Sequence, residues 1–255
     1  MRIVVKVGTS TLAYPGGGIN IRRAESLCRV LSDLKNSGDE IILVTSGAIG
    51  MGLGKLGIRT RPSDMPTKQA AAAVGQCELM NVYDTMFTTY NHIAAQLLIT
   101  GSIVQDENSL MNFKNTMNRL LELKALPIIN ENDTVETAEI AIGDNDTLAA
   151  IVSSIIEADL LVLLSDIDGL FTADPKKDPN ARIIPVVNEI TPEIEELAGG
   201  AGSTLGTGGM QTKIRAARIC GEAGCDMIIA NGRDPEILYA LQDGREFGTR
   251  FIGKR

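Results

Sequence analysis

Short apolar runs with almost no polar residues recur along the chain, and they constrain its fold more than any other feature. They occupy residues 3–5, 41–44, 93–99 with interruptions, 127–129, 160–164 and 227–230. A strand with one solvated face alternates apolar and polar side chains, whereas a strand covered on both faces does not, and such strands are typical of parallel sheets. The runs therefore predict a mostly parallel sheet buried between two layers.

Segments with helical periodicity separate these runs. Residues 20–37 begin at Asn20, a good N-cap, end at Gly38, and place on one face Ile21, Ala24, Leu27, Cys28, Leu31 and Leu34. Further helices are predicted over residues 67–90, 108–124, 144–158 and 209–224. Residues 134–142 predict a small hairpin, and residues 183–187 predict a short strand after an exposed loop. The alternation predicts an α/β fold, and without a Pro-, Ser- or charge-rich linker we expect one domain over residues 1–255.

The composition narrows the classes of function. The chain has 255 residues, of which 44% are hydrophobic, enough for a sizeable core. A net charge of -8, aromatic residues at 4% and no Trp argue against nucleic-acid binding. Cys28, Cys77, Cys220 and Cys225 match no zinc or C-x-x-C spacing, so we expect reduced core thiols. No signal peptide or spanning apolar run is present, and we expect a cytoplasmic protein without membrane contact.

Two segments place a lysine beside glycines. Lys6 precedes Gly8 at the end of the first apolar run, and Lys213 closes a glycine-rich stretch that opens a predicted helix. Glycines let backbone N–H groups approach an oxyanion, and a helix N-terminus and a lysine add positive potential. No G-x-x-x-x-G-K-[ST] loop is present, and a glycine-rich turn is also an ordinary helix start. Together the two half-sites indicate phosphoryl transfer. The alternative is that Lys6 is a solvated strand-end residue and Lys213 a helix surface residue.

Polar clusters follow four of the apolar runs, at residues 6–10, 45–48, 130–133 and 165–169. Asn, Asp, Ser and Gly also follow strands simply because turns need them. In an open α/β sheet, however, ligands bind beyond the carboxyl ends of the strands. Four polar strand ends together with two lysines therefore favour a ligand site at one edge of the sheet.

The motifs at residues 6–10, 46–48, 130–133, 143–146, 165–166, 169–175 and 207–213 resemble, in order, those of the amino-acid kinase family. The resemblance spans nearly the whole chain and implies a three-layer α/β/α sandwich, with the amino acid bound toward the N-terminal half and ATP toward the C-terminal half. It implies phosphorylation of the γ-carboxylate of L-glutamate to L-glutamyl 5-phosphate, the first step toward proline. Members acting on acetylglutamate, aspartate or uridylate, and a non-catalytic sensor on the same fold, stay open as alternatives. We expect a form without the C-terminal PUA domain of some members.

The resemblance also implies roles for individual residues. Lys6 and Lys213 contact the phosphates in transit, and Asp146 holds both lysines. The residues expected to bind L-glutamate are Ser46, Gly47, Asn130, Asp133 and Asn145. Those expected to bind ATP are Lys6, Gly8, Ser165, Asp166, Thr207, Gly208, Gly209, Met210, Gln211, Thr212 and Lys213. We further expect L-proline as a feedback inhibitor and a dimer or tetramer.

The expected chemistry needs little from the protein beyond charge and alignment. A glutamate γ-carboxylate has a pKa of about 4.3, so it is ionised at neutral pH and needs no general base. His92, the only histidine, has no obvious partner and is assigned no role. We expect Mg²⁺ with ATP and assign it no protein ligand, because this ion retains waters and takes phosphate oxygens as its main ligands, so few protein carboxylates are needed. The alternative to a role in the site is that residues 143–146 form only a helix-capping turn.

Overall fold

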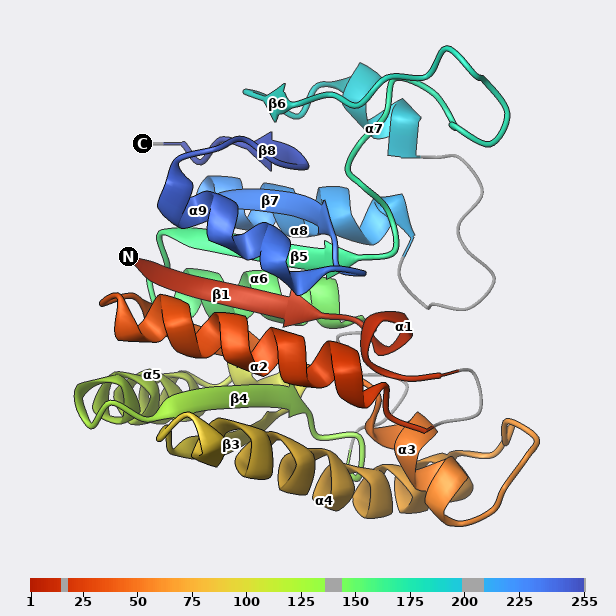
Figure 1. The fold of residues 1–255 in the computed structure, drawn as a ribbon, viewed down its shortest axis with the longest axis vertical. Helices are drawn as coiled ribbons and strands as arrows, with labels where there is room; N and C mark the ends of the chain where they lie inside the picture. Colours follow the sequence, from red (N-terminus) through yellow and green to blue (C-terminus); the bar gives the residue numbers. More distant parts are fainter. Residues whose placement is uncertain (15–17, 136–143, 199–208, 255) are drawn as a thin grey trace.

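The computed structural model describes residues 1–14, 18–135, 144–198 and 209–254. Within these ranges one sheet contains the strands β1 (Arg2–Val7), β2 (Glu40–Val44), β3 (Ala94–Ile99), β4 (Leu126–Glu131), β5 (Leu160–Ser165), β6 (Val186–Val187), β7 (Asp226–Asn231) and β8 (Thr249–Phe251). Their order across the sheet is β3-β4-β2-β1-β5-β7-β8-β6 (Figure 1). Of the neighbouring pairs, β7 and β8 run antiparallel and the others run parallel. The mostly parallel sheet predicted from the apolar runs is confirmed.

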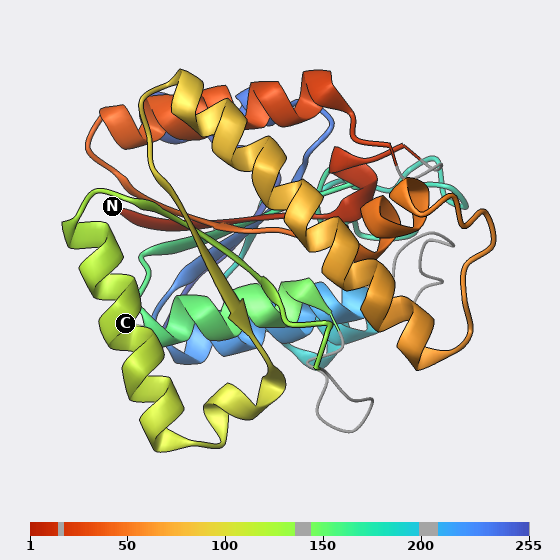
Figure 2. The ribbon, with the colours of Figure 1, turned by 90° about the horizontal axis from the view of Figure 1, so that it is seen from below.

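Helices cover both faces of the sheet. The described helices are α1 (Thr9–Leu12), α2 (Ile21–Asn36), α3 (Ala48–Lys55), α4 (Met65–Thr89), α5 (Glu107–Glu122), α6 (Asn145–Ile155), α7 (Pro192–Ala198), α8 (Met210–Glu222) and α9 (Ala240–Asp243), with 3-10 helices η1 (Gly101–Val104) and η2 (Pro235–Tyr239). Figure 2 shows α2 and α4 on one face and α5, α6 and α8 on the other. The predicted three-layer α/β/α sandwich is therefore confirmed. None of the helices in the described ranges is long and apolar enough to span a bilayer.

Each face of the sheet has its own hydrophobic core, and β1 contributes to both. Ile3 and Val5 pack in the core under α2 and α4, whereas Val4 packs in the core under α5, α6 and α8. All three side chains are fully buried, which explains why the strand carries no polar alternation. Because side chains alternate along a strand, Lys6 projects on the same side as Val4, toward α6 and α8.

At the start of α2 the predicted N-cap is confirmed, but one side chain predicted to be buried is exposed. Asn20 caps the helix, accepting a hydrogen bond from the Arg23 backbone N–H at 3.2 Å. Ile21, predicted on the buried face, is 66% exposed. It is the first residue of the helix, and helical side chains point back toward the N-terminus, so Ile21 lies beyond the region that packs on the sheet.

Two further expectations need correction, and one lies outside the described residues. All four cysteines are free and three are buried, but Cys77 is exposed on α4, so it is not a core thiol. The strand predicted over residues 183–187 is only β6, preceded by an isolated bridge between Ile183 and Phe171. The hairpin predicted over residues 134–142 falls almost entirely outside the described ranges.

The contact between α3 and α4 depends on two glycines. A Cβ added to Gly75 would lie 1.7 Å from the carbonyl oxygen of Ala48, and one added to Gly52 would lie 1.8 Å from that of Ala71. The absence of side chains at these positions lets the two helix backbones touch. Because α3 begins directly after Gly47, which has φ +104, the long helix α4 braces the loop at the carboxyl end of β2.

Candidate active site

The four polar strand ends predicted from the sequence lie along one edge of the sheet. They follow β4, β2, β1 and β5, which are consecutive neighbours and parallel (Figure 1). Parallel neighbours present their carboxyl ends at the same edge, so residues 6–10, 45–48, 130–133 and 165–169 meet there. His92 directly precedes the stretch leading into β3, at the opposite edge, which agrees with its having no assigned role.

At this edge two lysines share one carboxylate. Asp146 Oδ1 lies 2.7 Å from Lys6 Nζ, and Asp146 Oδ2 lies 2.9 Å from Lys213 Nζ. The side chains of Lys6, Lys213 and Asp146 are only 12%, 6% and 2% exposed, so neither lysine is a solvated surface residue. Lys6 comes from β1, Asp146 from the first turn of α6 and Lys213 from the first turn of α8. Thr212 Oγ1 supports the group, 2.9 Å from Asp146 Oδ2.

The charges in this group determine how Asp146 titrates. Burial by itself would raise the pKa of Asp146, but the charges of Lys6 and Lys213 and their hydrogen bonds outweigh it and hold that pKa well below its usual range. Asp146 is therefore a carboxylate at neutral pH. Two ammonium groups and one carboxylate leave a net positive charge in a nearly buried place, and such a place favours an anionic ligand.

The neighbouring carboxylate has a different task. Asp144 is the N-cap of α6: its Oδ1 accepts a hydrogen bond from the Thr147 backbone N–H at 2.8 Å, and its Oδ2 accepts one from Thr147 Oγ1 at 2.9 Å. The helix-capping interpretation of residues 143–146 thus holds for Asp144, while Asp146 binds the lysines. Among the described residues no group of three His, Cys, Asp or Glu side chains is arranged to hold a metal ion.

A cluster of amide side chains lies beside the lysines. Asn145 Nδ2 donates to the carbonyl oxygen of Thr45 at 2.5 Å, to Ser46 Oγ at 2.9 Å and to Asn130 Oδ1 at 3.0 Å. Asn130 is 3% exposed, and its Nδ2 donates to Gln76 Oε1 at 2.9 Å. The predicted residues Ser46, Asn130 and Asn145 are therefore brought together. Gln76 was missed, although an isolated polar residue within the alanine-rich stretch of α4 was a signal that could have found it.

The other predicted residues are placed as follows. Gly8 is the N-cap of α1, and a Cβ there would lie 3.6 Å from Lys6 Nζ. Ser165 ends β5 half-buried and donates to the exposed Asp166 at 3.2 Å. Gly47 and Asp133 are half-buried in the loops after β2 and β4, Gly209 is the N-cap of α8, and Met210 and Gln211 form its first turn. Thr207 and Gly208 lie outside the described residues.

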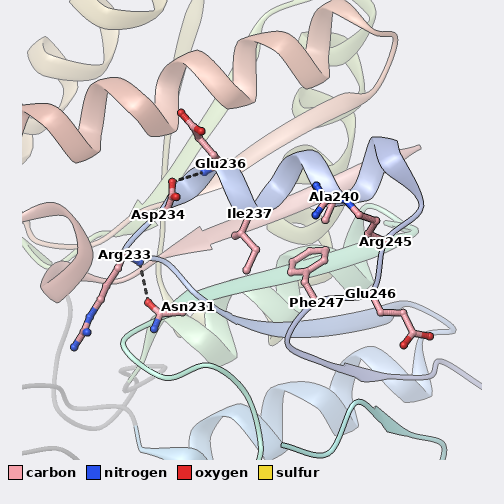
Figure 3. A pocket seen from close by; sticks show the side chains of 9 residues that line it. All are labelled: Asn231, Arg233, Asp234, Glu236, Ile237, Ala240, Arg245, Glu246 and Phe247. Atoms are coloured by element: carbon pink, nitrogen blue, oxygen red, sulfur yellow. Dashed lines mark hydrogen bonds between the residues drawn. The ribbon is translucent and has the colours of Figure 1, made fainter.

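A cavity of about 490 Å³ lies on the other face of the sheet (Figure 3). Its walls include Ile237 and Phe247, which pack with the core under α2 and α4, and not with the core under α6 and α8. None of the predicted site residues within the described ranges lines it. Its Asn231 is the strand neighbour of Ser165, and its Nδ2 donates to Asp168 Oδ1 at 2.6 Å, in the polar cluster that follows β5. The reacting charges converge elsewhere, so we do not assign this cavity to the reaction.

Comparison with known proteins identifies related sequences. The model of the "Amino acid kinase family" matches residues 1–231. Glutamate 5-kinase of Clostridium perfringens is 50% identical over 100% of this chain and 96% of its own length. Glutamate 5-kinase of Listeria monocytogenes is 49% identical over 100% of this chain and 94% of its own length. Glutamate 5-kinase of Caldanaerobacter subterraneus is 50% identical over 99% of this chain, which spans 68% of that relative.

Solved structures share the fold at low identity. An isopentenyl phosphate kinase aligns with a TM-score of 0.69 at 20% identity, over 99% of this chain and 100% of that one. UMP kinase from Bacillus anthracis aligns with a TM-score of 0.67 at 17% identity, over 100% of this chain and 96% of that one. At such identities the likeness concerns the arrangement of the sheet and its helices.

Proposed function

This chain belongs to the amino acid kinase family, and on that premise we propose that it transfers the γ-phosphoryl group of ATP to the γ-carboxylate of L-glutamate. Relatives that share half of its residues over the whole chain bear the name glutamate 5-kinase. The observation that carries the proposal is the shared carboxylate of Asp146 between Lys6 and Lys213. Two cations held by one carboxylate at the carboxyl edge of a parallel sheet suit a phosphoryl group in transit.

The reaction balances without proton transfer. An oxygen of the γ-carboxylate bonds to the γ-phosphorus of ATP, and the bond from that phosphorus to the β–γ bridging oxygen breaks, leaving its electron pair on ADP. A carboxylate with a pKa of about 4.3 is already the nucleophile at neutral pH. A general base is therefore unnecessary, in agreement with a site built from lysines, amides and an aspartate.

The protein's task is to neutralise charge and align two anions. In the transition state negative charge moves toward the β–γ bridge and the transferring group, where Lys6 and Lys213 would stabilise it. Asp146 would hold both ammonium groups in place so that no reorganisation is needed during the reaction. Lys213 also lies in the first turn of α8, where the helix N-terminus adds positive potential for an anion.

Magnesium fits this arrangement as a companion of ATP. The described residues contain no group of three His, Cys, Asp or Glu side chains that could ligate the ion, and Asp146 already pairs with two lysines. Mg²⁺ takes phosphate oxygens and water readily, so ATP itself would supply its main ligands. When bound, the ion would offset phosphate charge alongside Lys6 and Lys213.

The amino acid is proposed to bind in the N-terminal half, and ATP in the C-terminal half. Ser46, Gly47, Asn130, Asp133 and Asn145 would form the L-glutamate site. ATP would contact the loop after β1, Ser165 and Asp166, and the residues from Thr207 to Lys213. Carboxylate and amide oxygens are acceptors for a free ammonium group, so the site favours an amino acid whose nitrogen is unmodified.

The experiment is an ATP-dependent assay that traps an acyl phosphate as its hydroxamate. L-Glutamate, N-acetyl-L-glutamate and L-aspartate are tested as acceptors, and ADP release is followed for UMP. We expect turnover of L-glutamate alone, because acetylation removes the ammonium group and leaves buried acceptors unpaired. Equal turnover of N-acetyl-L-glutamate would refute the glutamate assignment. Turnover of UMP alone would show that the substrate is a nucleotide and would also refute it.

Four wider properties are part of the same proposal. The reaction would be the first step toward proline and would take place in the cytoplasm. L-Proline would lower the rate by competing for the carboxylate-and-ammonium site, and initial rates unchanged by millimolar proline at half-saturating L-glutamate would contradict this. The protein would assemble as a dimer or tetramer, which light scattering coupled to gel filtration measures directly.

A further inference from the structure

Gln76 is a polar side chain buried at the back of the amide cluster. It is 8% exposed, in the middle of α4, and its Oε1 accepts the hydrogen bond from Asn130 Nδ2 at 2.9 Å. Its Nε2 is buried and has no partner within the described part of the chain. A buried donor without a partner usually costs stability, so a side chain that keeps one needs a reason beyond packing.

A backbone carbonyl determines which amide groups of this cluster donate hydrogen bonds and which accept them. The carbonyl oxygen of Thr45 can only accept, so the group of Asn145 that faces it must be the NH₂. Asn130 must then present its Oδ1 to Asn145 and its Nδ2 to Gln76. Gln76 is the last member of this series of hydrogen bonds: its carbonyl oxygen accepts from Asn130, and its own NH₂ has no acceptor among the described residues.

This assignment of donors and acceptors decides which atom of Asn145 a ligand can meet. Its Nδ2 carries two hydrogens and lies within hydrogen-bond distance of three acceptors, from Thr45, Ser46 and Asn130, so it has no donor left for a ligand. No described residue donates a hydrogen bond to Asn145 Oδ1, which remains available as an acceptor. A carbonyl oxygen suits a free ammonium group, which brings three N–H donors and a charge, better than an acylated nitrogen, which keeps one uncharged N–H.

We propose that Gln76 is a positioning residue for the amino-acid substrate: it orients the amide of Asn130 and, through it, that of Asn145, so that the site presents an acceptor to the substrate ammonium group. The inference rests on the proposed phosphorylation of L-glutamate. Without an acceptor at position 76, Asn130 Nδ2 would be buried unpaired and would turn toward Asn145, whose own NH₂ it would displace. Gln76 would thus act on substrate choice without touching the substrate.

The test compares Gln76→Met, which keeps the shape and removes the acceptor, with Gln76→Glu, which keeps an acceptor oxygen. For Gln76→Met we expect KM for L-glutamate to rise by about 10-fold, with kcat and KM for ATP within about threefold of wild type. The preference for L-glutamate over glutarate, which lacks the amino group, should fall by about the same factor. Gln76→Glu should restore KM to within about threefold.

Ser32→Ala is the matched control, because Ser32 Oγ is also buried and unpartnered among the described residues but lies on α2, outside the amide cluster. It should leave every kinetic constant unchanged. Ser32→Ala should melt at or above the wild-type temperature, since it removes an unsatisfied buried group. Gln76→Met should melt close to the wild-type temperature, because it removes the unpaired Nε2 but takes away the acceptor of Asn130 Nδ2. A Gln76→Met protein that unfolds or melts well below wild type, or one with unchanged KM and unchanged preference, overturns the inference. Wild-type protein inactive on L-glutamate would instead refute the proposed function.

Discussion

Replacing Asp146 by asparagine isolates the electrostatic core of the site. The two side chains have nearly the same shape, so the change removes one charge and little packing. Lys6 Nζ and Lys213 Nζ lie 2.7 and 2.9 Å from the carboxylate oxygens, and both side chains are nearly buried. After the substitution two ammonium groups would face each other without a counter-charge.

The magnitude follows from those distances. At an effective dielectric constant of about 20, each contact supplies about 6 kcal/mol of Coulomb attraction before desolvation is subtracted. Breaking a buried pair by removing one partner costs about 3–5 kcal/mol, and the partial exposure of Lys6 favours the lower end. About 3 kcal/mol in a chain of this size corresponds to a fall in Tm of roughly 6–12 °C. The turnover number should fall by about 10²–10³, because the lysines lose their fixed positions.

The pH dependence provides an independent check of the cause. The pKa of Asp146 is lowered in the folded protein, so its contribution to stability is complete above the unfolded value of about 3.9 and declines as pH falls below it. The gap in Tm between wild type and Asp146→Asn should therefore be the same at pH 7 and pH 5 and should narrow as the pH is taken below about 4. Calorimetric melts across this range measure it.

Glu157→Gln is the matched control, because Glu157 also pairs with a lysine, Lys114, but at a surface site where both side chains are exposed. It should change Tm by no more than about 2 °C and leave kcat unchanged. The reasoning is refuted if Asp146→Asn behaves like this control. It is also refuted if the gap in Tm widens as the pH is lowered.

Two further predictions follow from the same structure. Lys6→Ala and Lys213→Ala should each lower kcat by about 10²–10³ with a much smaller change in KM for L-glutamate, and arginine should not restore activity at either position; steady-state kinetics with near-wild-type turnover would remove that lysine from the mechanism. Gly75→Ala should lower Tm by several degrees, because the new Cβ would lie 1.7 Å from the Ala48 carbonyl oxygen, whereas Gly50→Ala on α3 meets nothing within 4 Å and should match or exceed wild type in the same melts.

The sequence was informative wherever burial alone determines local structure. Unbroken apolar runs identified the inner strands, because a strand covered on both faces needs apolar residues at every position. The helical periodicity of residues 20–37 and the cap at Asn20 located α2 to within a residue or two. The polar strand ends followed from the same logic, since a parallel sheet presents the ends of its strands at one edge.

The single side chains that departed from prediction lie where periodicity carries no information. Ile21 has the correct spacing for the buried face but starts the helix beyond the sheet. Cys77 is apolar in character and yet lies on the exposed side of α4. The helix α3 was not predicted because its sequence is rich in glycine, which has a low helix propensity. Its close packing against Gly75 on α4 stabilises it in the folded protein.

The sequence by itself determined the sandwich, the family and the two lysines, because each depends on a local pattern of burial or on a motif contiguous in the chain. The family resemblance already named Asp146 as the partner of those lysines, but only the tertiary structure shows why Asp146 meets them and Asp144 does not, since this depends on how the start of α6 is turned toward β1 and α8. The tertiary structure alone brought Gln76 to Asn130, residues 54 positions apart. Contacts between side chains on different elements depend on the paths of the connections and on packing at the ångström scale, and no periodicity along a single segment records either of them.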